Sequence, residues 1–179
     1  GPVDHLFAMP VLVDYVRGRV DLTNTAIVSP DAGRIKVAEQ WGNRLGGVPL
    51  AFVHKTRDLT RPNQATANRV VGDVSGRTAV IVDDLIDTAG TICGAVRIVL
   101  EAGAKDVIVA ATHGVLSDPA TQRLRESGLR ELVVTDTLPI GPEKRFPAMT
   151  VLPIAPVLAR AIDEVFEDGS VTSLFDGAY

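Results

Sequence analysis

Three carboxylates and two hydroxyl side chains lie close together in residues 80–91, which read VIVDDLIDTAGT. The adjacent Asp83 and Asp84 end an apolar, β-branched run, and carboxylates accept hydrogen bonds well from vicinal hydroxyl groups. The segment Asp87–Thr91 then leads into a helical pattern, and the unpaired N–H groups of a helix start favour a phosphate. Together these features predict a site for a phosphorylated sugar. The alternative is a helix cap beside a solvated, acidic turn.

The elements that must position this site follow from the order of the apolar patterns. Short runs rich in Val and Ile predict strands at residues 25–29, 49–54, 77–84, 106–113, 131–137 and 150–154. Helical patterns fall between most of them, at residues 32–46, 91–104, 119–127 and 156–169. Residues 55–69 are polar and basic, so we expect a long loop there, either functional or disordered. This alternation predicts an α/β fold, a doubly wound, mostly parallel sheet with helices on both faces.

Polar motifs follow four of the predicted strands: SPDAG, HKTR, DDLIDTAGT and TH. Ligands of an open parallel sheet bind beyond the carboxyl ends of its strands, so these motifs are expected to face one site. Other residues are weaker candidates. We expect His113 to be a satisfied strand-end histidine, and His54 either to finish its strand or to join the loop. Cys93 and Trp41 fit packing positions.

Composition indicates one ordinary globular domain, with 179 residues, 46% hydrophobic and 22% charged. A net charge of −4 argues against nucleic-acid and membrane partners, which need a basic surface. The single cysteine excludes an intrachain disulfide and favours a reducing, cytoplasmic setting. No apolar run reaches the roughly 18 residues of a membrane span. The sequence also has no Walker-type phosphate loop.

The stretch at residues 80–91 resembles the phosphoribosyl-pyrophosphate (PRPP) binding signature of the type I phosphoribosyltransferase fold. Its form, with an aspartate before Thr88-Ala89-Gly90-Thr91, is most similar to the ribose-phosphate pyrophosphokinase (PRPP synthase) family. Further motifs agree with that family in the expected order: VSPDAGR (28–34), FVHKTR (52–57), VVGDVSGRTAVIVDD (70–84), ATHGVLS (111–117), ELVVTDT (131–137) and SVTSLF (170–175). The resemblance is specific and spans nearly the whole chain.

The resemblance implies transfer of the diphosphate of ATP, a co-substrate, to the C1 hydroxyl of ribose 5-phosphate, which gives PRPP and AMP. It implies that Lys55 and Arg57 are catalytic cations and that Asp31 binds Mg²⁺ near the diphosphate. The residues implied to bind ribose 5-phosphate are Arg57, Asp83, Asp84, Asp87, Thr88, Ala89, Gly90 and Thr91. The chemistry is consistent, because Mg²⁺ and fixed cations neutralise the charge on phosphate oxygens during such a transfer.

The chain matches only the second half of such an enzyme. We expect residues 1–20 to be a connecting segment, 21–169 a phosphoribosyltransferase-like domain and 170–179 a C-terminal tail. The family's adenine-binding residues and one metal-binding histidine lie upstream, so we expect the chain alone to be inactive or very weak. The resemblance also implies a homo-oligomer in the full-length protein. One departure is Arg34, where many relatives have a second glycine after SPDAG.

Two other functions share the same phosphate-binding pattern. A phosphoribosyltransferase that consumes PRPP needs a hood that recognises the nitrogenous base, and no segment suits that role. A non-catalytic, PRPP-synthase-associated regulatory subunit would keep the fold without turnover. The intact Asp31, Lys55, Arg57 and Asp83 argue against that reading.

Overall fold

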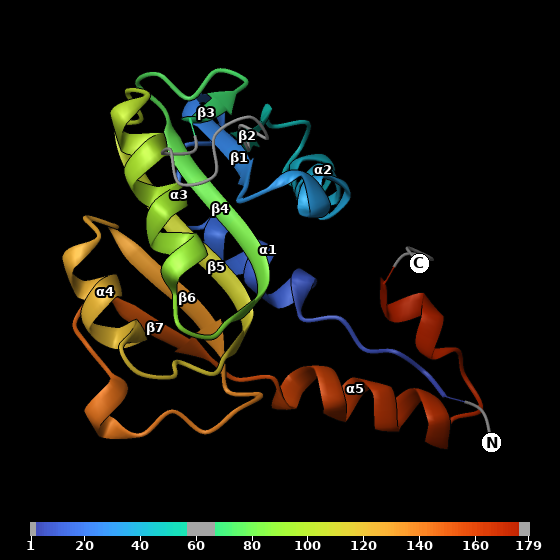
Figure 1. Cartoon of the computed structure of the whole chain (residues 1–179). Helices are drawn as coiled ribbons and strands as arrows, with labels where there is room; N and C mark the ends of the chain where they lie inside the picture. The colour runs from blue at the N-terminus through green and yellow to red at the C-terminus, as the bar shows by residue number, and fades with distance from the viewer. Residues whose placement is uncertain (1–2, 57–66, 176–179) are drawn as a thin grey trace.

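A single mixed sheet organises the chain in the computed structural model, which describes residues 3–56 and 67–175 (Figure 1). Within these residues, seven strands have the order β3-β2-β1-β4-β5-β6-β7. Their bounds are β1 Thr25–Ser29, β2 Leu50–Thr56, β3 Ala67–Val71, β4 Thr78–Ile86, β5 Asp106–Gly114, β6 Glu131–Thr135 and β7 Met149–Leu152. Neighbouring strands run parallel except β2 and β3, which are antiparallel. The sheet confirms the predicted mostly parallel α/β fold.

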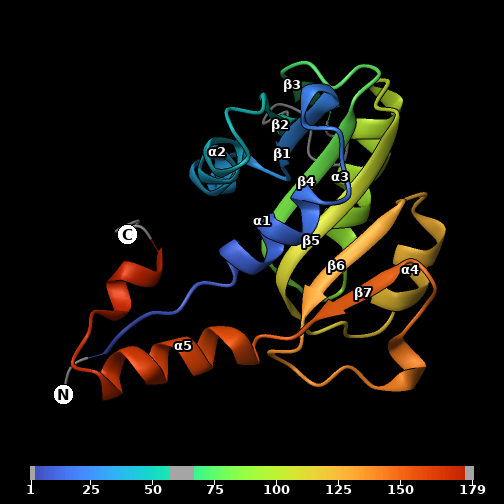
Figure 2. The ribbon, with the colours of Figure 1, turned by 180° about the vertical axis from the view of Figure 1, so that it is seen from behind.

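Helices cover both faces of the sheet (Figures 1 and 2). The α-helices are α1 Met9–Arg17, α2 Ile35–Arg44, α3 Gly90–Glu101, α4 Ala120–Glu126 and α5 Ala155–Phe166, and the short 3₁₀ turns include η2 Ala32–Arg34 and η4 Val171–Phe175. Alternate residues of β4 point to opposite faces, as the pleat of a strand requires. Ala79 and Ile81 pack in the cluster under α3 and α4, whereas Val80 and Val82 pack in the cluster under α1 and α2.

Two parts of the chain differ from the sequence-based expectation. Both ends of the predicted loop at residues 55–69 are strand instead, because β2 continues to Thr56 and an antiparallel strand, β3, begins at Ala67. The segment expected to be a connector, residues 1–20, contains α1, whose Leu12, Val13 and Val16 are buried against the sheet. An apolar face on a short helix needs such a surface to be stable. The three domain boundaries stay a prediction.

Helix α5 extends away from the sheet beside the N-terminal segment and η4 (Figures 1 and 2). A small cluster anchors it, with Val157, Ala161 and Val171 at its centre. The helix also exposes four apolar residues, Leu158, Ile162, Val165 and Phe166, the last 83% exposed. Among the described residues, no helix is long and apolar enough to cross a membrane.

Candidate functional site

The site lies where the connections of two adjacent parallel strands leave in opposite directions. β1 and β4 are neighbours in the sheet. The chain leaves β1 through α2 towards β2 on one side, and it leaves β4 through α3 towards β5 on the other. Such a switch point opens a crevice beyond the carboxyl ends of the strands, which is the usual ligand position in open α/β sheets.

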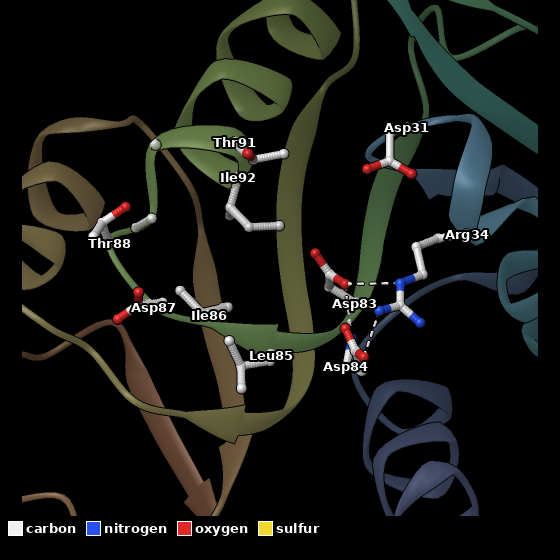
Figure 3. Close-up of a pocket in the computed structure, with 12 residues that line it drawn as sticks. Asp31, Arg34, Asp83, Asp84, Leu85, Ile86, Asp87, Thr88, Thr91 and Ile92 are labelled. Atoms are coloured by element: carbon white, nitrogen blue, oxygen red, sulfur yellow. Dashed lines mark hydrogen bonds and ion pairs between the residues drawn. The ribbon is translucent and has the colours of Figure 1, made fainter.

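A pocket of about 450 Å³ occupies this crevice (Figure 3). Two segments line it: the turn after β1, through Asp31 and Arg34, and the whole of residues 83–92. All the described residues that sequence analysis assigned to ribose 5-phosphate therefore line one cavity together with the predicted Mg²⁺ ligand. The pocket brings together segments about fifty residues apart in the chain.

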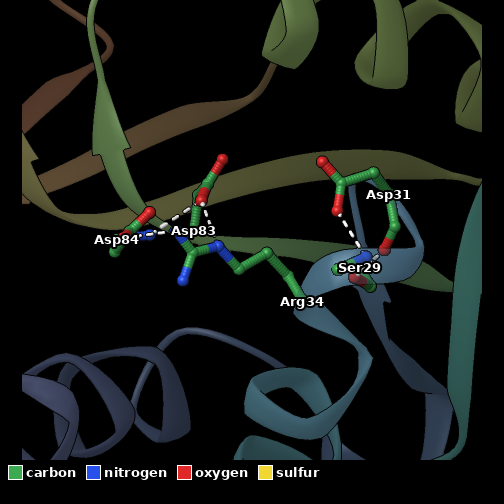
Figure 4. Close-up of polar contacts among 6 residues, drawn as sticks. Ser29, Asp31, Arg34, Asp83 and Asp84 are labelled. Carbon is green, nitrogen blue, oxygen red and sulfur yellow. Dashed lines mark hydrogen bonds and ion pairs between the residues drawn. The ribbon is translucent and has the colours of Figure 1, made fainter.

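The aspartate pair lies at one end of the pocket and is held by Arg34 (Figures 3 and 4). Arg34 Nη2 lies 2.5 Å from Asp84 Oδ2, and its Nε lies 3.6 Å from Asp83 Oδ1. The main-chain N–H of Asp84 also donates to Asp83 Oδ1, at 2.8 Å. Both aspartates belong to β4, which ends two residues later than predicted. The carboxylates are thus fixed by a strand at one side and a guanidinium at the other.

The two carboxyl groups of this pair have different affinities for protons. Burial and the neighbouring Asp84 raise the pKa of Asp83 to about 6. The pKa of Asp84 is lowered despite some burial, because it is hydrogen bonded by Asp83 and paired with Arg34. The carboxyl group with the raised pKa is also the less exposed one: the Asp83 side chain is 15% exposed and the Asp84 side chain 53%. A pair of carboxyl groups with separated pKa values is typical of functional sites.

The opposite end of the pocket is the start of α3. Ala89 precedes the helix with φ of 60°, in the left-handed region, and no side chain of the described residues caps the helix there. The first N–H groups of α3 have no carbonyl acceptor within the helix, and no side-chain cap replaces it in the described part of the chain. Neither Asp87 nor Thr88 caps α3, so the alternative of a helix cap at these residues is wrong. The arrangement suits a phosphate group, which helix N-termini bind through such N–H groups.

Asp31 lines the pocket from the turn after β1, where it also has a structural role (Figure 4). Its Oδ1 accepts a hydrogen bond from the N–H of Gly33 at 2.8 Å and so caps the 3₁₀ turn η2. Within the described residues, no three His, Cys, Asp or Glu side chains form a metal cluster. Mg²⁺ usually takes one or two protein carboxylates and completes its shell with waters and substrate phosphates. The Asp31 carboxylate therefore fits that ion without further protein ligands.

Of the two predicted catalytic cations, the structure describes the backbone position of Lys55 alone. Lys55 is in β2, opposite Asn68 of β3, and β2 pairs with β1 on its other side. Arg57 lies outside the described residues. Of the weaker candidates, His113 Nδ1 lies 2.8 Å from Thr137 Oγ1, as expected for a satisfied histidine. Trp41 is buried among apolar residues, as expected for packing.

The remaining two candidates take ordinary positions. His54 lies in β2, opposite Arg69 of β3. Cys93 is half-buried, and that burial raises the pKa of its thiol. A thiol of this kind is less reactive than an exposed one, because the thiolate is the nucleophile.

Two arginines belong to the site although sequence analysis gave neither a role. Arg34 was noted only as a departure from the family, and its ion pairs with β4 become visible only in three dimensions. Arg123, on α4, donates from Nη1 to the carbonyl oxygen of Thr88 at 3.0 Å. It therefore supports the segment Asp87–Thr91, here called the phosphate segment. No local pattern could have found Arg123, because 35 residues separate the partners.

Comparison with known proteins gives a consistent family match. The family model described as phosphoribosyl synthetase-associated domain matches residues 58–176. A ribose-phosphate pyrophosphokinase of Bifidobacterium longum is 70% identical over 178 residues, which are 98% of this chain and 52% of that protein. The phosphoribosylpyrophosphate synthetase structure of Mycobacterium smegmatis is 58% identical, with a TM-score of 0.85 over 94% of this chain and 54% of its own. The chain thus spans about half the length of these relatives.

A more distant structure shares only the fold. The purine phosphoribosyltransferase of Pyrococcus horikoshii is 21% identical, with a TM-score of 0.51, and covers 80% of this chain and 90% of its own. The likeness supports the phosphoribosyltransferase-like architecture of the sheet.

Proposed function

The chain belongs to the phosphoribosyl synthetase-associated domain family, and on that premise we propose that it is the C-terminal half of a ribose-phosphate pyrophosphokinase. The reaction transfers the diphosphate of ATP to the C1 hydroxyl of ribose 5-phosphate, and the products are PRPP and AMP. Two relatives that bear this activity in their names are 60% identical or more over nearly the whole chain, which supports the assignment.

One observation carries the proposal: a single pocket joins a carboxylate pair to an uncapped helix start. These two ends suit the two chemical halves of ribose 5-phosphate. The N–H groups at the start of α3, with the hydroxyls of Thr88 and Thr91, would bind the 5-phosphate. Asp83 and Asp84 would accept hydrogen bonds from the ribose hydroxyls. Holding both ends fixes the direction of the C1 hydroxyl, which is the main requirement of an in-line transfer.

The remaining residues would act on the diphosphate. Asp31 would hold Mg²⁺, which neutralises phosphate charge when bound. Lys55 and Arg57 would supply fixed positive charge from the side of β2, the strand beside the Asp31 turn. Positive charge placed in advance stabilises the oxygens on which negative charge grows during the transfer.

The direct test is AMP release from Mg-ATP, with and without ribose 5-phosphate, by a longer polypeptide in which the upstream half precedes this chain. Sugar-dependent AMP release is the expected result. If ribose 5-phosphate or PRPP binds but no AMP is released, the regulatory-subunit reading replaces this one. Conversion of PRPP and a nitrogenous base to a nucleotide would instead identify a phosphoribosyltransferase.

We further propose that the chain alone does not turn over, because the family's adenine-binding residues lie in the other half. On this proposal, residues 1–20 join the halves, residues 21–169 form the phosphoribosyltransferase-like domain and residues 170–179 form a tail. The isolated chain should bind ribose 5-phosphate in calorimetry and release no AMP from Mg-ATP. Turnover by the isolated chain would contradict the division, and sedimentation of the longer polypeptide would test the proposed homo-oligomer.

A further inference from the structure

Arg34 joins the two segments that form the pocket. It ends the η2 turn after β1, and its side chain reaches across to Asp83 and Asp84 of β4 (Figure 4). The Arg34 side chain is 40% exposed, and the residue itself lines the pocket. A planar guanidinium can donate to two acceptors at once in a fixed geometry, which a lysine ammonium cannot reproduce. Arg34 therefore sets the relative position of the two carboxylates.

These contacts use one oxygen of each carboxylate. Arg34 and the N–H of Asp84 meet Asp83 at Oδ1, and Arg34 meets Asp84 at Oδ2. The other oxygen of each group lies outside these contacts. Figure 3 shows the second oxygen of Asp83 directed into the pocket and away from Arg34. A carboxylate held through one oxygen can still accept a hydroxyl at the other.

The charges of the pocket also indicate that Arg34 holds the two carboxylates together. Among the described residues that line it, four are aspartates, and Arg34 is the only cation. Two adjacent carboxylates repel each other and would also repel an anionic ligand. A cation bound to both removes much of this repulsion without occupying the phosphate end of the pocket.

We propose that Arg34 is a positioning residue for the sugar: it orients Asp83 and Asp84 so that one oxygen of each faces the ribose hydroxyls, and it stays in place when the sugar binds. The inference rests on the proposed function, because it assumes a hydroxylated ligand at this end of the pocket. It concerns the sugar end alone. Phosphate binding at the start of α3 does not depend on it.

Calorimetry with two probes, ribose 5-phosphate and inorganic phosphate, tests the proposal. Arg34→Ala should weaken ribose 5-phosphate binding about tenfold, the size of a lost charge-assisted hydrogen bond, and should change phosphate binding much less. Arg34→Lys should recover part of the loss. Lys36→Ala is the matched control, because it removes the same charge from an exposed position on α2 outside the pocket. A thermal melt of each variant checks the fold.

The outcomes separate this inference from the proposed function. If the natural chain binds ribose 5-phosphate no more tightly than inorganic phosphate, the proposed function fails at this site. If it prefers ribose 5-phosphate and Arg34→Ala keeps that preference, the positioning role is wrong. Tighter sugar binding in Arg34→Ala would show that the guanidinium blocks the pocket. An equal loss for both probes would reduce Arg34 to a general electrostatic attraction.

Discussion

At the residue scale, Asp83 combines burial with a neighbouring negative charge, and both disfavour its ionised form. Its pKa is about 6 in the folded chain against 3.8 as the ordinary value. At pH 7.5 the group is ionised in the folded and unfolded chain alike, so the buried charge lowers the free energy of unfolding. As the pH falls from about 6 towards 3.8, the folded chain takes up the proton first, and this destabilisation is progressively lost.

Asp83→Asn should therefore raise the free energy of unfolding at pH 7.5, by about 1 kcal/mol, while abolishing most sugar binding. At pH 4.5 the difference should be smaller, because Asp83 is then protonated in the folded chain and partly protonated in the unfolded chain. Urea unfolding at both pH values measures the difference. Asp14→Asn serves as the control, because the Asp14 side chain is 72% exposed. A stability gain of Asp83→Asn that grows as the pH falls would contradict the assigned cause.

The chemical types at the site were predictable from the sequence, but the contacts between them were not. Residues 83–91 carry their chemistry in one continuous stretch, so their order alone indicated a sugar end and a phosphate end. The ion pairs of Arg34 join positions about fifty residues apart, and single-sequence patterns hold no information about such pairs. Asp31 shows a further limit, since it both lines the pocket and caps its own turn.

At the element scale, the phosphate segment depends on α4 through one hydrogen bond, from Arg123 to the carbonyl of Thr88. Arg123→Met should weaken inorganic phosphate binding roughly fivefold, because the segment loses its support although no ligand contact is removed. Calorimetry measures the change. Arg125→Met is the matched control on the same helix, because Arg125 donates to the carbonyl of Arg145 instead. Equal losses in both variants would show that only the overall charge matters.

The edge of the sheet depends on a glycine after β3. Gly72 has φ of +106°, and a Cβ there would lie 2.7 Å from the carbonyl oxygen of Leu50 and 2.8 Å from Cα of Ala51. Gly72→Ala should therefore lower the free energy of unfolding by at least about 2 kcal/mol. Gly94→Ala should act in the opposite direction, by about 0.8 kcal/mol, because that helical position is open. Urea unfolding of both variants tests the contrast, and a stable Gly72→Ala would refute the predicted clash.

The elements that sequence analysis found are those with strong patterns. β4 and β5 are runs of buried Val, Ile and Ala, and both were predicted within two residues of their observed ends. β3 was missed because Ala67–Val71 is short and two of its five residues are polar. α1 was missed because Pro10 and Asp14 interrupt its apolar run, although a proline is well tolerated in the first turn of a helix.

At the scale of the whole molecule, α5 carries half of the large hydrophobic residues that the described part of the chain exposes. Ile162, Val165 and Phe166 are 69%, 64% and 83% exposed. Contiguous apolar surface of this kind promotes association in water. We expect the isolated chain to bind a hydrophobic dye and to self-associate as its concentration rises. The double variant Ile162→Glu/Phe166→Glu should reduce both effects and change the free energy of unfolding by less than about 0.5 kcal/mol.

Sedimentation velocity and dye fluorescence measure these effects. The double variant Lys36→Gln/Arg160→Gln is the control, because it makes the same change in net charge at two exposed polar positions. Association that persists without the apolar side chains of α5 would place the contact on another surface.

The strand order also constrains when the site can form during synthesis. β1 is complete at Ser29, but its inner neighbour in the sheet is β4, which ends at Ile86. A ribosome must therefore add more than fifty residues before the turn of Asp31 can meet the carboxylates of β4. Until then the apolar face of β1 lacks its permanent neighbour, which is the interval in which a nascent parallel sheet is most exposed to wrong partners. The pocket can thus form only once both of its walls are made, although the turn of Asp31 is synthesised well before the carboxylates of β4.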